Sequence, residues 1–166
     1  GLQHGTVTVL MDKEGYEVTT YRVDGDYEDG RHPKQVMFTS SLEEDLKRRD
    51  FTINAMAYHP ERGLVDLFHG MEDMEHKIVR CVGDPMERFH EDALRILRAV
   101  RFSAQLGFTI EEKTKAGIQA LAPNLKCVSA ERIQTELVKL LVSPHPDYLR
   151  VAYETGITRE FLPEFD

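Results

Sequence analysis

Residues 84–102 constrain the fold of this chain more than any other stretch. Asp84 is a favourable N-cap, and Pro85 suits the first helical position, where its missing N–H is not needed. Gly107 supplies a stop signal. At about 100° per residue, one face collects six apolar side chains: Phe89, Ala93, Ile96, Leu97, Val100 and Ala104. The pattern predicts one amphipathic helix around which the rest of the chain is organised.

The opposite face of this predicted helix carries Asp92, Arg95, Arg98 and Arg101, with little acid nearby to neutralise the arginines. One interpretation is an ordinary solvated helix face. The other is recognition of a nucleotide, because every Lys or Arg position between residues 78 and 112 is arginine. The planar arginine fork matches phosphate oxygens and base edges, which an ammonium does not. Both interpretations stay open at this point.

Asp92 lies one helical turn before Arg95, and such a pair discriminates between bases. A carboxylate accepts from an exocyclic amine, and a guanidinium donates to a ring nitrogen or a carbonyl. Cytosine and adenine present an amine beside a ring acceptor, whereas guanine and uracil present a carbonyl beside an N–H. An Asp/Arg pair on a rigid helix would therefore select C and A together.

Composition limits the classes of protein to consider. The 166 residues suffice for one domain or parts of two, and 41% hydrophobic residues can bury a core. No apolar run approaches the roughly 20 residues of a membrane span, and no signal peptide is present. Cys81 and Cys127 stand alone, which is typical of a reducing compartment. We therefore expect a cytoplasmic protein that does not contact a membrane.

The net charge of −8 argues against a broad nucleic-acid surface, which is normally basic. Any nucleotide must then be held by a local concentration of arginine. The seven histidines show no ligand spacing, so none is assigned to a metal. Asp24 and Asp26 form a DxD pair that could hold metal ions. Because the pair flanks a glycine in the acidic loop of residues 23–33, we interpret it as loop and not as a metal site.

The first part of the chain predicts two β-hairpins. Residues 5–10 and 16–22 are β-branched and aromatic and are separated by Asp12-Lys13-Glu14-Gly15. Residues 57–59 and 64–68 form a second pair around a Pro/Gly turn. Asp66 and Gly70 then mark a turn, and a lone aspartate at a strand end is usually structural.

A helix is expected over residues 40–49, which open with a capping box and an acidic first turn. Its basic end places Arg48, Arg49, Asp50 and Asn54 within a few residues of one another. This cluster is either a nucleotide site or a helix C-terminus whose cations complement the dipole. Spacing alone does not decide between the two.

The sequence pattern from residue 84 onward predicts helices. Residues 109–112 cap a helix that runs to about residue 121, Ser129 caps the helix of residues 130–141, and a last helix covers residues 146–154. The helix after Ser129 is expected to bury Ile133, Leu137, Leu140 and Leu141. Its charged residues Glu131, Arg132 and Glu136 either brace the arginine helix or are ordinary surface charges.

Six ordered stretches together resemble a known family. They are Glu17-Val18-Thr19-Thr20, Asp29-Gly30-Arg31-His32, residues 44–55 (EDLKRRDFTINA), Asp66-Leu67-Phe68-His69-Gly70, residues 91–102 (EDALRILRAVRF) and residues 131–139 (ERIQTELVK). In this order they resemble the class II tRNA nucleotidyltransferases, which comprise the CCA-adding enzymes and bacterial poly(A) polymerases. The likeness extends over nearly the whole chain.

The resemblance implies a role for each stretch. It implies a nucleotide-binding motif in which Arg49 contacts the triphosphate and Arg48, Asp50 and Asn54 support it. It implies a hinge motif between Asp66 and Gly70. It also implies a base-reading template formed by Glu91, Asp92 and Arg95. Arg98 and Arg101 would add nucleotide contacts, and residues 131–139, with Glu131 and Glu136, would brace the template. Asp29 and Arg31 would belong to the flexible loop that family members use when they add A after C. Glu17 would be a further acidic group near the catalytic site.

The fold that the resemblance implies is α+β. Residues 1–70 would be the C-terminal part of a nucleotidyltransferase head built from antiparallel hairpins, residues 71–142 an all-helical neck, and residues 143–166 the start of a helical body. The family's Mg²⁺ ligands, a strand-borne DxD, are expected upstream of Gly1, so no metal ligand is assigned within this chain. The 166 residues alone are therefore expected to be inactive.

The function implied for the full protein is template-free addition of CMP and AMP, from CTP and ATP, to the 3′ end of tRNA. A poly(A) polymerase shares these motifs and is the first alternative. A CC-adding enzyme fits less well, because the loop of residues 24–33 is present. A non-catalytic helical module that binds nucleotides or RNA is the alternative from another class. Oligomeric state is not indicated by the sequence.

Overall fold

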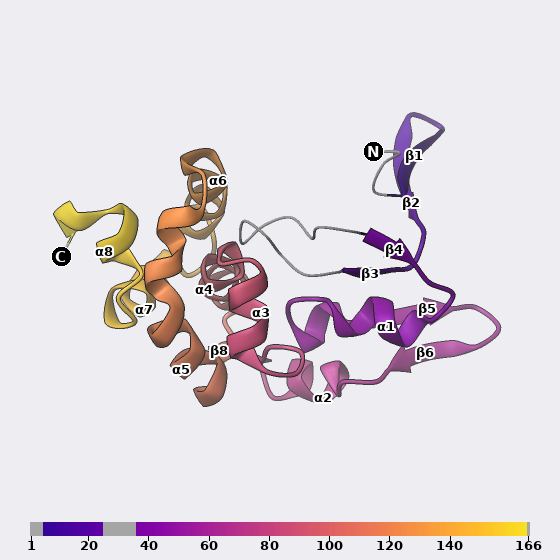
Figure 1. Ribbon diagram of the computed structural model, residues 1–166, viewed down its shortest axis with the longest axis horizontal. Coiled ribbons are helices and arrows are strands. Elements are labelled where there is room, and N and C mark those ends of the chain that lie inside the picture. Colours follow the sequence, from indigo (N-terminus) through magenta and orange to yellow (C-terminus); the bar gives the residue numbers. More distant parts are fainter. Residues whose placement is uncertain (1–4, 25–35, 166) are drawn as a thin grey trace.

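Short β-hairpins occupy one end of the molecule and a body of helices occupies the other (Figure 1). The computed structural model describes residues 5–24 and 36–165. Within this part, strand pairs β1–β2, β3–β4 and β5–β6 are antiparallel, and β7–β8 is parallel. The expected α+β fold, with antiparallel hairpins followed by helices, is confirmed.

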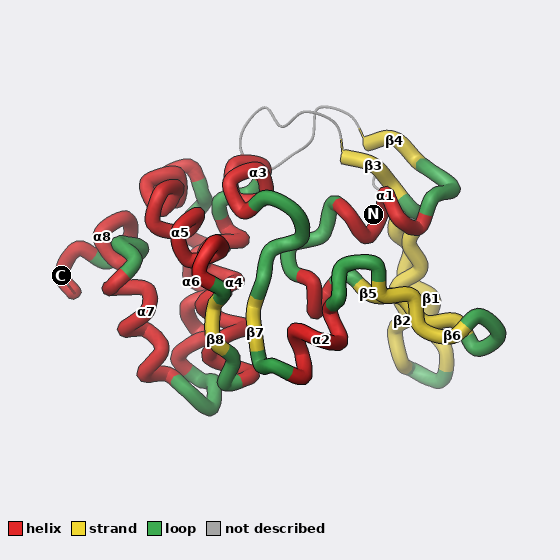
Figure 2. The backbone as a smooth tube through the Cα atoms, turned by 90° about the horizontal axis from the view of Figure 1, so that it is seen from below, coloured by secondary structure: helices red, strands yellow, loops and turns green. Residues whose placement is uncertain are grey.

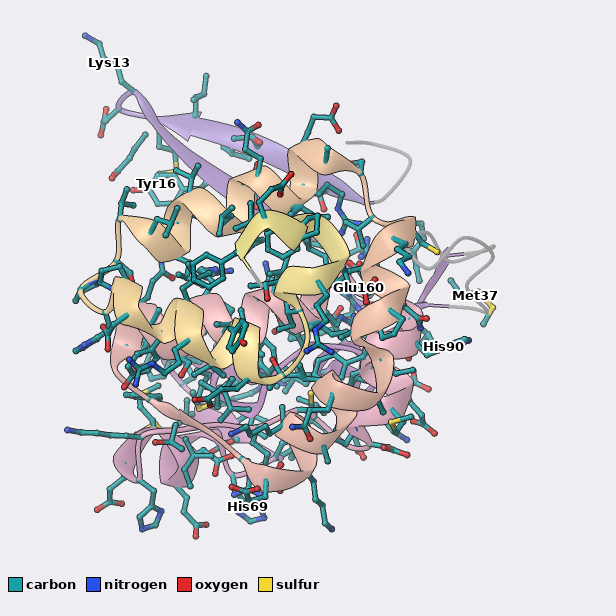
Figure 3. The ribbon with its side chains drawn as sticks, turned by 90° about the vertical axis from the view of Figure 1, so that its left-hand side faces the viewer. Lys13, Tyr16, Met37, His69, His90 and Glu160 are labelled. Carbon is teal, nitrogen blue, oxygen red and sulfur yellow. The ribbon has the colours of Figure 1, made fainter. Side chains whose placement is uncertain are left out.

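The first hairpin joins β1 (Thr6–Met11) to β2 (Glu14–Thr19). Its turn is shorter than the sequence indicated: Glu14 and Gly15 already lie in β2, and only Asp12 and Lys13 lie between the strands. Both turn residues have positive φ, 49° and 70°. Two such residues match the right-handed twist of the strands, which explains the tight connection. Figure 3 shows Lys13 pointing away from the helical body.

Two further antiparallel pairs follow. β3 (Arg22–Asp24) pairs with β4 (Val36–Phe38), and β5 (Met56–His59) pairs with β6 (Gly63–Asp66). The second hairpin expected from the sequence is thus confirmed. The positive φ of Gly63, 75°, opens β6 at the turn.

Helix α1 (Leu42–Lys47) begins with half of the expected capping box. Ser41 Oγ accepts from the Glu44 N–H at 3.3 Å, as predicted. The Glu44 carboxylate, however, accepts from the Thr39 hydroxyl and does not reach back to the N-cap. A 3-10 turn, η2 (Thr52–Asn54), and helix α2 (Gly70–Glu75) complete this part of the chain.

The predicted helix over residues 84–102 is two helices, α3 (Pro85–Glu91) and α4 (Leu94–Leu106). The cap at Asp84, Pro85 at the first position and the stop at Gly107 are confirmed. The chain leaves the helical conformation at Asp92, whose φ and ψ are −146° and 105°. The Asp92 carboxylate accepts from the Leu94 N–H at 3.0 Å. An aspartate that bonds to a nearby backbone N–H favours a helix start over a helix interior, which explains the break.

Strands β7 (Ile78–Val79) and β8 (Thr109–Ile110) run side by side and join the start of α3 to the end of α4 (Figure 2). The remaining elements are α5 (Glu112–Leu121), η3 (Ala122–Cys127), α6 (Ala130–Leu141), η4 (Pro146–Tyr148), α7 (Leu149–Glu154), α8 (Thr158–Phe161) and η5 (Pro163–Phe165). Within the predicted cap of residues 109–112, Glu111 is the N-cap of α5. Ser129 precedes α6 without a side-chain cap bond.

One hydrophobic core connects residues from Phe51 to Ile157. All six apolar residues of the face predicted around α3 and α4 are buried. The face predicted for α6 is partly wrong: Ile133 and Leu140 are buried, but Leu141 is 46% exposed. Glu136 is buried there instead, because α6 packs against the polar side of α4. Over the described residues we find no helix with the length and apolar character needed to cross a membrane.

Candidate functional site

A polar cavity of about 540 Å³ lies where the end of α1 meets the start of α4 and of α6. Its lining consists of Arg48, Arg49, Asp50, Asn54, Asp92, Leu94, Arg95, Arg98, Phe102 and Arg132. Eight of these were singled out from the sequence, and the fold brings them together although they come from three separate stretches. A cavity of this volume and this concentration of arginine suits an anionic ligand of nucleotide size.

Asp92 is held at both carboxylate oxygens. Oδ1 accepts from the Leu94 N–H at 3.0 Å, and Oδ2 accepts from Nη2 of Arg132 at 2.7 Å. Of the two alternatives for the charged residues of α6, Arg132 is therefore a brace of the arginine face and not an ordinary surface charge. The break between α3 and α4 places this carboxylate at the cavity wall and not along a continuous helix side.

Arg95, the second residue of the predicted base-reading pair, contacts both α3 and the end of α1. Its Nη1 forms an ion pair with Glu91 at 2.5 Å and donates to the carbonyl of Arg88 at 3.2 Å. Its Nη2 donates to the Arg48 carbonyl at 3.0 Å. Glu91 thus pairs with both Arg95 and Arg88, and its role in reading the base stays a prediction.

Arg98 connects α4 to Asp50. Its Nε and Nη2 donate to Oδ2 of Asp50 at 2.7 and 2.6 Å. Oδ1 of Asp50 accepts from the Phe51 N–H at 2.9 Å and from the Asn54 amide at 3.3 Å. The expectation that little acid neutralises the arginines is wrong, because the acids come from other elements: Asp50, Glu91 and Glu136.

Arg101 does not lie on an exposed face, which corrects the sequence prediction. It is 7% exposed, and its Nε donates to Glu136 at 2.7 Å. Its Nη1 donates to Gln105 at 3.0 Å, and its guanidinium lies 3.7 Å from the centre of the Phe102 ring. Phe102 itself lines the cavity, so Arg101 supports the wall from behind. A direct contact of Arg101 with a nucleotide stays a prediction.

Asp66, Gly70 and Glu131 also lie outside the cavity lining, and the first two have local partners. Asp66 accepts from the N–H groups of Gly70 at 2.7 Å and Met71 at 2.9 Å, and so holds the start of α2. Gly70 packs on the backbone of η2, where an added Cβ would lie 2.3 Å from the Thr52 carbonyl oxygen. Glu131 is exposed on α6.

Glu17 is exposed on β2 opposite Thr8, in the hairpin at the opposite end of the molecule from α5–α8 (Figure 1). Its catalytic role stays a prediction. Asp26, Asp29 and Arg31 lie outside the described residues, as does the side chain of Asp24. Within the described ranges, no three His, Cys, Asp or Glu side chains gather as a metal-ligand set. The described residues therefore do not fit a Mg²⁺ site.

Sequence reasoning missed Phe102 as a lining residue and Asp45 as a partner of two lining residues. Asp45 is 3% exposed and forms ion pairs with Arg48 at 2.8 Å and Arg49 at 3.0 Å. The i,i+3 and i,i+4 spacing of these charges could have indicated the pairs.

Comparison with known proteins agrees with this geometry. Residues 1–80 match the family model "Poly A polymerase head domain", and residues 107–166 match "Probable RNA and SrmB- binding site of polymerase A". The chain is 51% identical over 165 residues to the CCA-adding enzyme of Pediococcus pentosaceus, covering 99% of this chain and 42% of that protein. It is 54% identical over 166 residues to that of Lactobacillus helveticus, covering 99% and 41%.

Solved structures show the same likeness. The Bacillus stearothermophilus CCA-adding enzyme in complex with CTP superposes with a TM-score of 0.86 at 44% identity, covering 95% of this chain and 38% of that one. A complex of a CCA-adding enzyme with ATP gives a TM-score of 0.68 at 33% identity, covering 74% and 30%. The chain thus spans less than half the length of the relatives it matches. By its motifs, its fold and these relatives, the chain belongs to the family of CCA-adding enzymes and poly(A) polymerases.

Proposed function

We propose that this chain is the nucleotide-selecting part of a tRNA nucleotidyltransferase that adds CMP and AMP to the tRNA 3′ end. The observation that carries the proposal is that Asp92 and Arg95 line the same cavity as Arg49 and Arg98. A pair suited to the base edge and a set suited to phosphate thus share one space of nucleotide size. The relatives with CTP and with ATP support both substrates.

The base would be selected by exchange of hydrogen-bond partners. The Asp92 carboxylate accepts from Arg132, and a C or A amine would take that place. Arg95 donates to Glu91 and to two backbone carbonyls, and one of its N–H groups would turn to the ring acceptor. A carbonyl of G or U would face the Asp92 carboxylate, and this repulsion is what excludes it.

The phosphates would be held by arginine. The side chain of Arg49 is 43% exposed at the cavity, in contrast to that of Arg48 at 17%. Arg98 is fixed by Asp50, which orients its guanidinium along the same wall. Family members use Mg²⁺ for the transfer step itself. These residues bind and orient the nucleotide, so we expect the 166 residues alone to be inactive.

We also propose the division of the chain into a partial head (residues 1–70), a neck (71–142) and the start of a body (143–166). The core that includes both Phe51 and Ile118 supports a head and neck packed together. A poly(A) polymerase is the second candidate, because one matching family model carries that name. The relatives at 51% and 54% identity are CCA-adding enzymes, which favours CCA addition.

Isothermal titration of the purified chain with CTP, ATP, GTP and UTP tests the selection. CTP and ATP are expected to bind, and GTP and UTP to bind at least about tenfold more weakly, a difference of ~1.4 kcal/mol. Equal binding of all four would refute base reading by Asp92 and Arg95. Incorporation of CMP into tRNA by the 166 residues alone would refute the expected inactivity.

In a protein of the full length of the relatives, the choice of substrate distinguishes CCA addition from poly(A) synthesis. Incorporation of both CTP and ATP on tRNA supports CCA addition. Incorporation of ATP alone on any RNA supports poly(A) synthesis.

A further inference from the structure

Asp45 is a buried carboxylate that collects donors from three places in the chain. Its Oδ1 accepts from Nη2 of Arg48 at 2.8 Å, from Nε of Arg48 at 3.2 Å and from the Arg22 N–H at 3.2 Å. Its Oδ2 accepts from Nη2 of Arg49 at 3.0 Å. One side chain of α1 thereby ties β3 to two arginines of the cavity wall.

The charge of this carboxylate is part of the arrangement. Burial raises the pKa of Asp45, but hydrogen bonds from Arg48, Arg49 and the Arg22 N–H outweigh the effect of burial and hold the pKa below its ordinary value. Asp45 is therefore ionised at neutral pH, and its bonds to the two guanidinium groups are charge-assisted.

The two arginines differ in what their bonds to Asp45 leave accessible. Arg48 is held through two nitrogens, and its side chain is 17% exposed. Arg49 is held through one nitrogen, and its side chain is 43% exposed. Asp45 does not line the cavity, whereas Arg49 does. A guanidinium anchored at one corner keeps a fixed direction and still presents donors to a ligand.

We propose that Asp45 is a positioning residue for phosphate recognition, which aims the Arg49 guanidinium into the cavity and fixes it relative to β3. The inference rests on the proposed function, since it names the support of the phosphate-binding arginine. A dipole role in the first turns of α1 does not need this residue, because Glu43 and Glu44 supply acid there. Nor does that role explain why the carboxylate is buried against two arginines.

The test compares the affinities of CTP and CMP, which share the base but differ in phosphates. Titration calorimetry is run on the unsubstituted chain, on Asp45→Asn and on Asp73→Asn. Asp73 is a matched control: it is 5% exposed and bonded to Arg80 and Thr52, but it does not line the cavity. Asp45→Asn is expected to weaken CTP about tenfold, the loss of one charge-assisted bond, and CMP less than twofold. Asp73→Asn should leave the CTP:CMP ratio unchanged.

Two further variants separate positioning from folding. In an Arg49→Ala background, Asp45→Asn should cause no further loss of CTP affinity, because the two act through one guanidinium. Asp45→Glu keeps the charge and should recover most of the lost affinity. If Asp45→Asn lacks the native circular dichroism spectrum, the test uses Asp45→Glu in its place. Asp45→Glu is expected to weaken CTP binding about threefold and to keep the CMP affinity within twofold of the unsubstituted chain.

The outcomes distinguish the two proposals. An unchanged CTP:CMP ratio in Asp45→Asn, or additive losses with Arg49→Ala, overturns the role of Asp45 and leaves the proposed function intact. Where Asp45→Glu is used in place of Asp45→Asn, an unchanged CTP:CMP ratio in Asp45→Glu also overturns the role of Asp45. Absence of CTP binding by the unsubstituted chain overturns both.

Discussion

The Glu136 carboxylate accepts a 2.7 Å hydrogen bond from Nε of Arg101, and both side chains are less than one-tenth exposed. This ion pair fastens α6 to the side of α4 that carries the cavity arginines. Breaking it leaves a guanidinium buried among Phe102 and the core, with only Gln105 as a described side-chain acceptor. A buried charge without its partner is strongly destabilising.

Glu136→Ala is therefore expected to lower the free energy of unfolding by about 3–5 kcal/mol. Urea unfolding followed by circular dichroism measures the change. Glu131→Ala is the matched control, because Glu131 lies on the same helix and is exposed. Its effect should stay within about 0.5 kcal/mol. Similar losses for the two variants would contradict a structural role specific to Glu136.

Arg95→Ala should reduce discrimination between CTP and UTP more than Arg49→Ala does. Arg95 is proposed to read the base, whereas Arg49 is proposed to contact phosphate, which all nucleotides share. Arg49→Ala is expected to weaken both nucleotides by a similar factor. The ratio of the two dissociation constants, measured by calorimetry, is the relevant quantity, and an equal fall in that ratio for both variants contradicts the division of roles.

The two cysteines should differ sharply in reactivity. Burial raises the pKa of the Cys81 thiol to about 12, and Cys81 is 3% exposed, whereas Cys127 is exposed. Only a thiolate reacts with Ellman's reagent. At pH 8 the folded chain should release one equivalent of the coloured product, and the urea-unfolded chain two. Two equivalents from the folded chain would show that Cys81 is accessible.

Glu111 should contribute to acid sensitivity. Burial raises its pKa, but bonds from the Thr114 N–H and hydroxyl, together with Arg80, outweigh burial and hold the pKa below its ordinary value. A group whose pKa is lower in the folded state stabilises the fold above its ordinary pKa, about 4.3 for glutamate, and loses that contribution as the pH falls.

Glu111→Gln is therefore expected to be about 1 kcal/mol less stable than the unsubstituted chain at pH 7. The two should converge as the pH falls through the lowered pKa of Glu111. Urea unfolding at a series of pH values measures this difference, with the exposed neighbour in Glu112→Gln as control. A difference that grows towards acid pH would have the wrong sign.

Gly70→Ala should destabilise the junction of α2 with η2. The added Cβ would lie 2.3 Å from the Thr52 carbonyl oxygen, a backbone atom that cannot move aside alone. We expect a loss of about 1–3 kcal/mol, typical of overpacking. Met71→Ala, at an exposed position of the same helix, should change thermal stability far less. Equal melting temperatures for the Gly70→Ala variant and the unsubstituted chain would contradict the close approach.

Local signals made much of the site predictable. Asp84 marks a helix start through its side-chain carboxylate, and Pro85 and Gly107 mark helix ends through their backbone conformations. The periodic apolar face identifies the buried side. The cluster from Arg48 to Asn54 is contiguous in sequence, so its members had to lie close together. The resemblance to a family supplied the assignment of roles, which spacing alone left open.

Three features were not predictable, because their causes lie far away in sequence or in backbone geometry. The apolar period continues across Asp92, so nothing in the pattern marks the break that the bond from the Leu94 N–H stabilises. The burial of Arg101 depends on Glu136, which follows 35 residues later. The carboxylate of Asp45 also accepts from the backbone N–H of Arg22, which precedes it by 23 residues.

The β7–β8 pair has a consequence for how the cavity can adapt to a ligand. Thr109 N–H donates to the Lys77 carbonyl at 2.8 Å, and Glu111 N–H donates to the Val79 carbonyl at 3.0 Å. The chain that enters α3 and the chain that leaves α4 are therefore bound to each other, and the two helices form a ring closed by hydrogen bonds. Inside a closed ring, a rotation at Asp92 cannot be relieved by separation of the ends. A tilt of α3 is therefore coupled to a tilt of α4, because the two helices share the Asp92 junction and the β7–β8 hydrogen bonds.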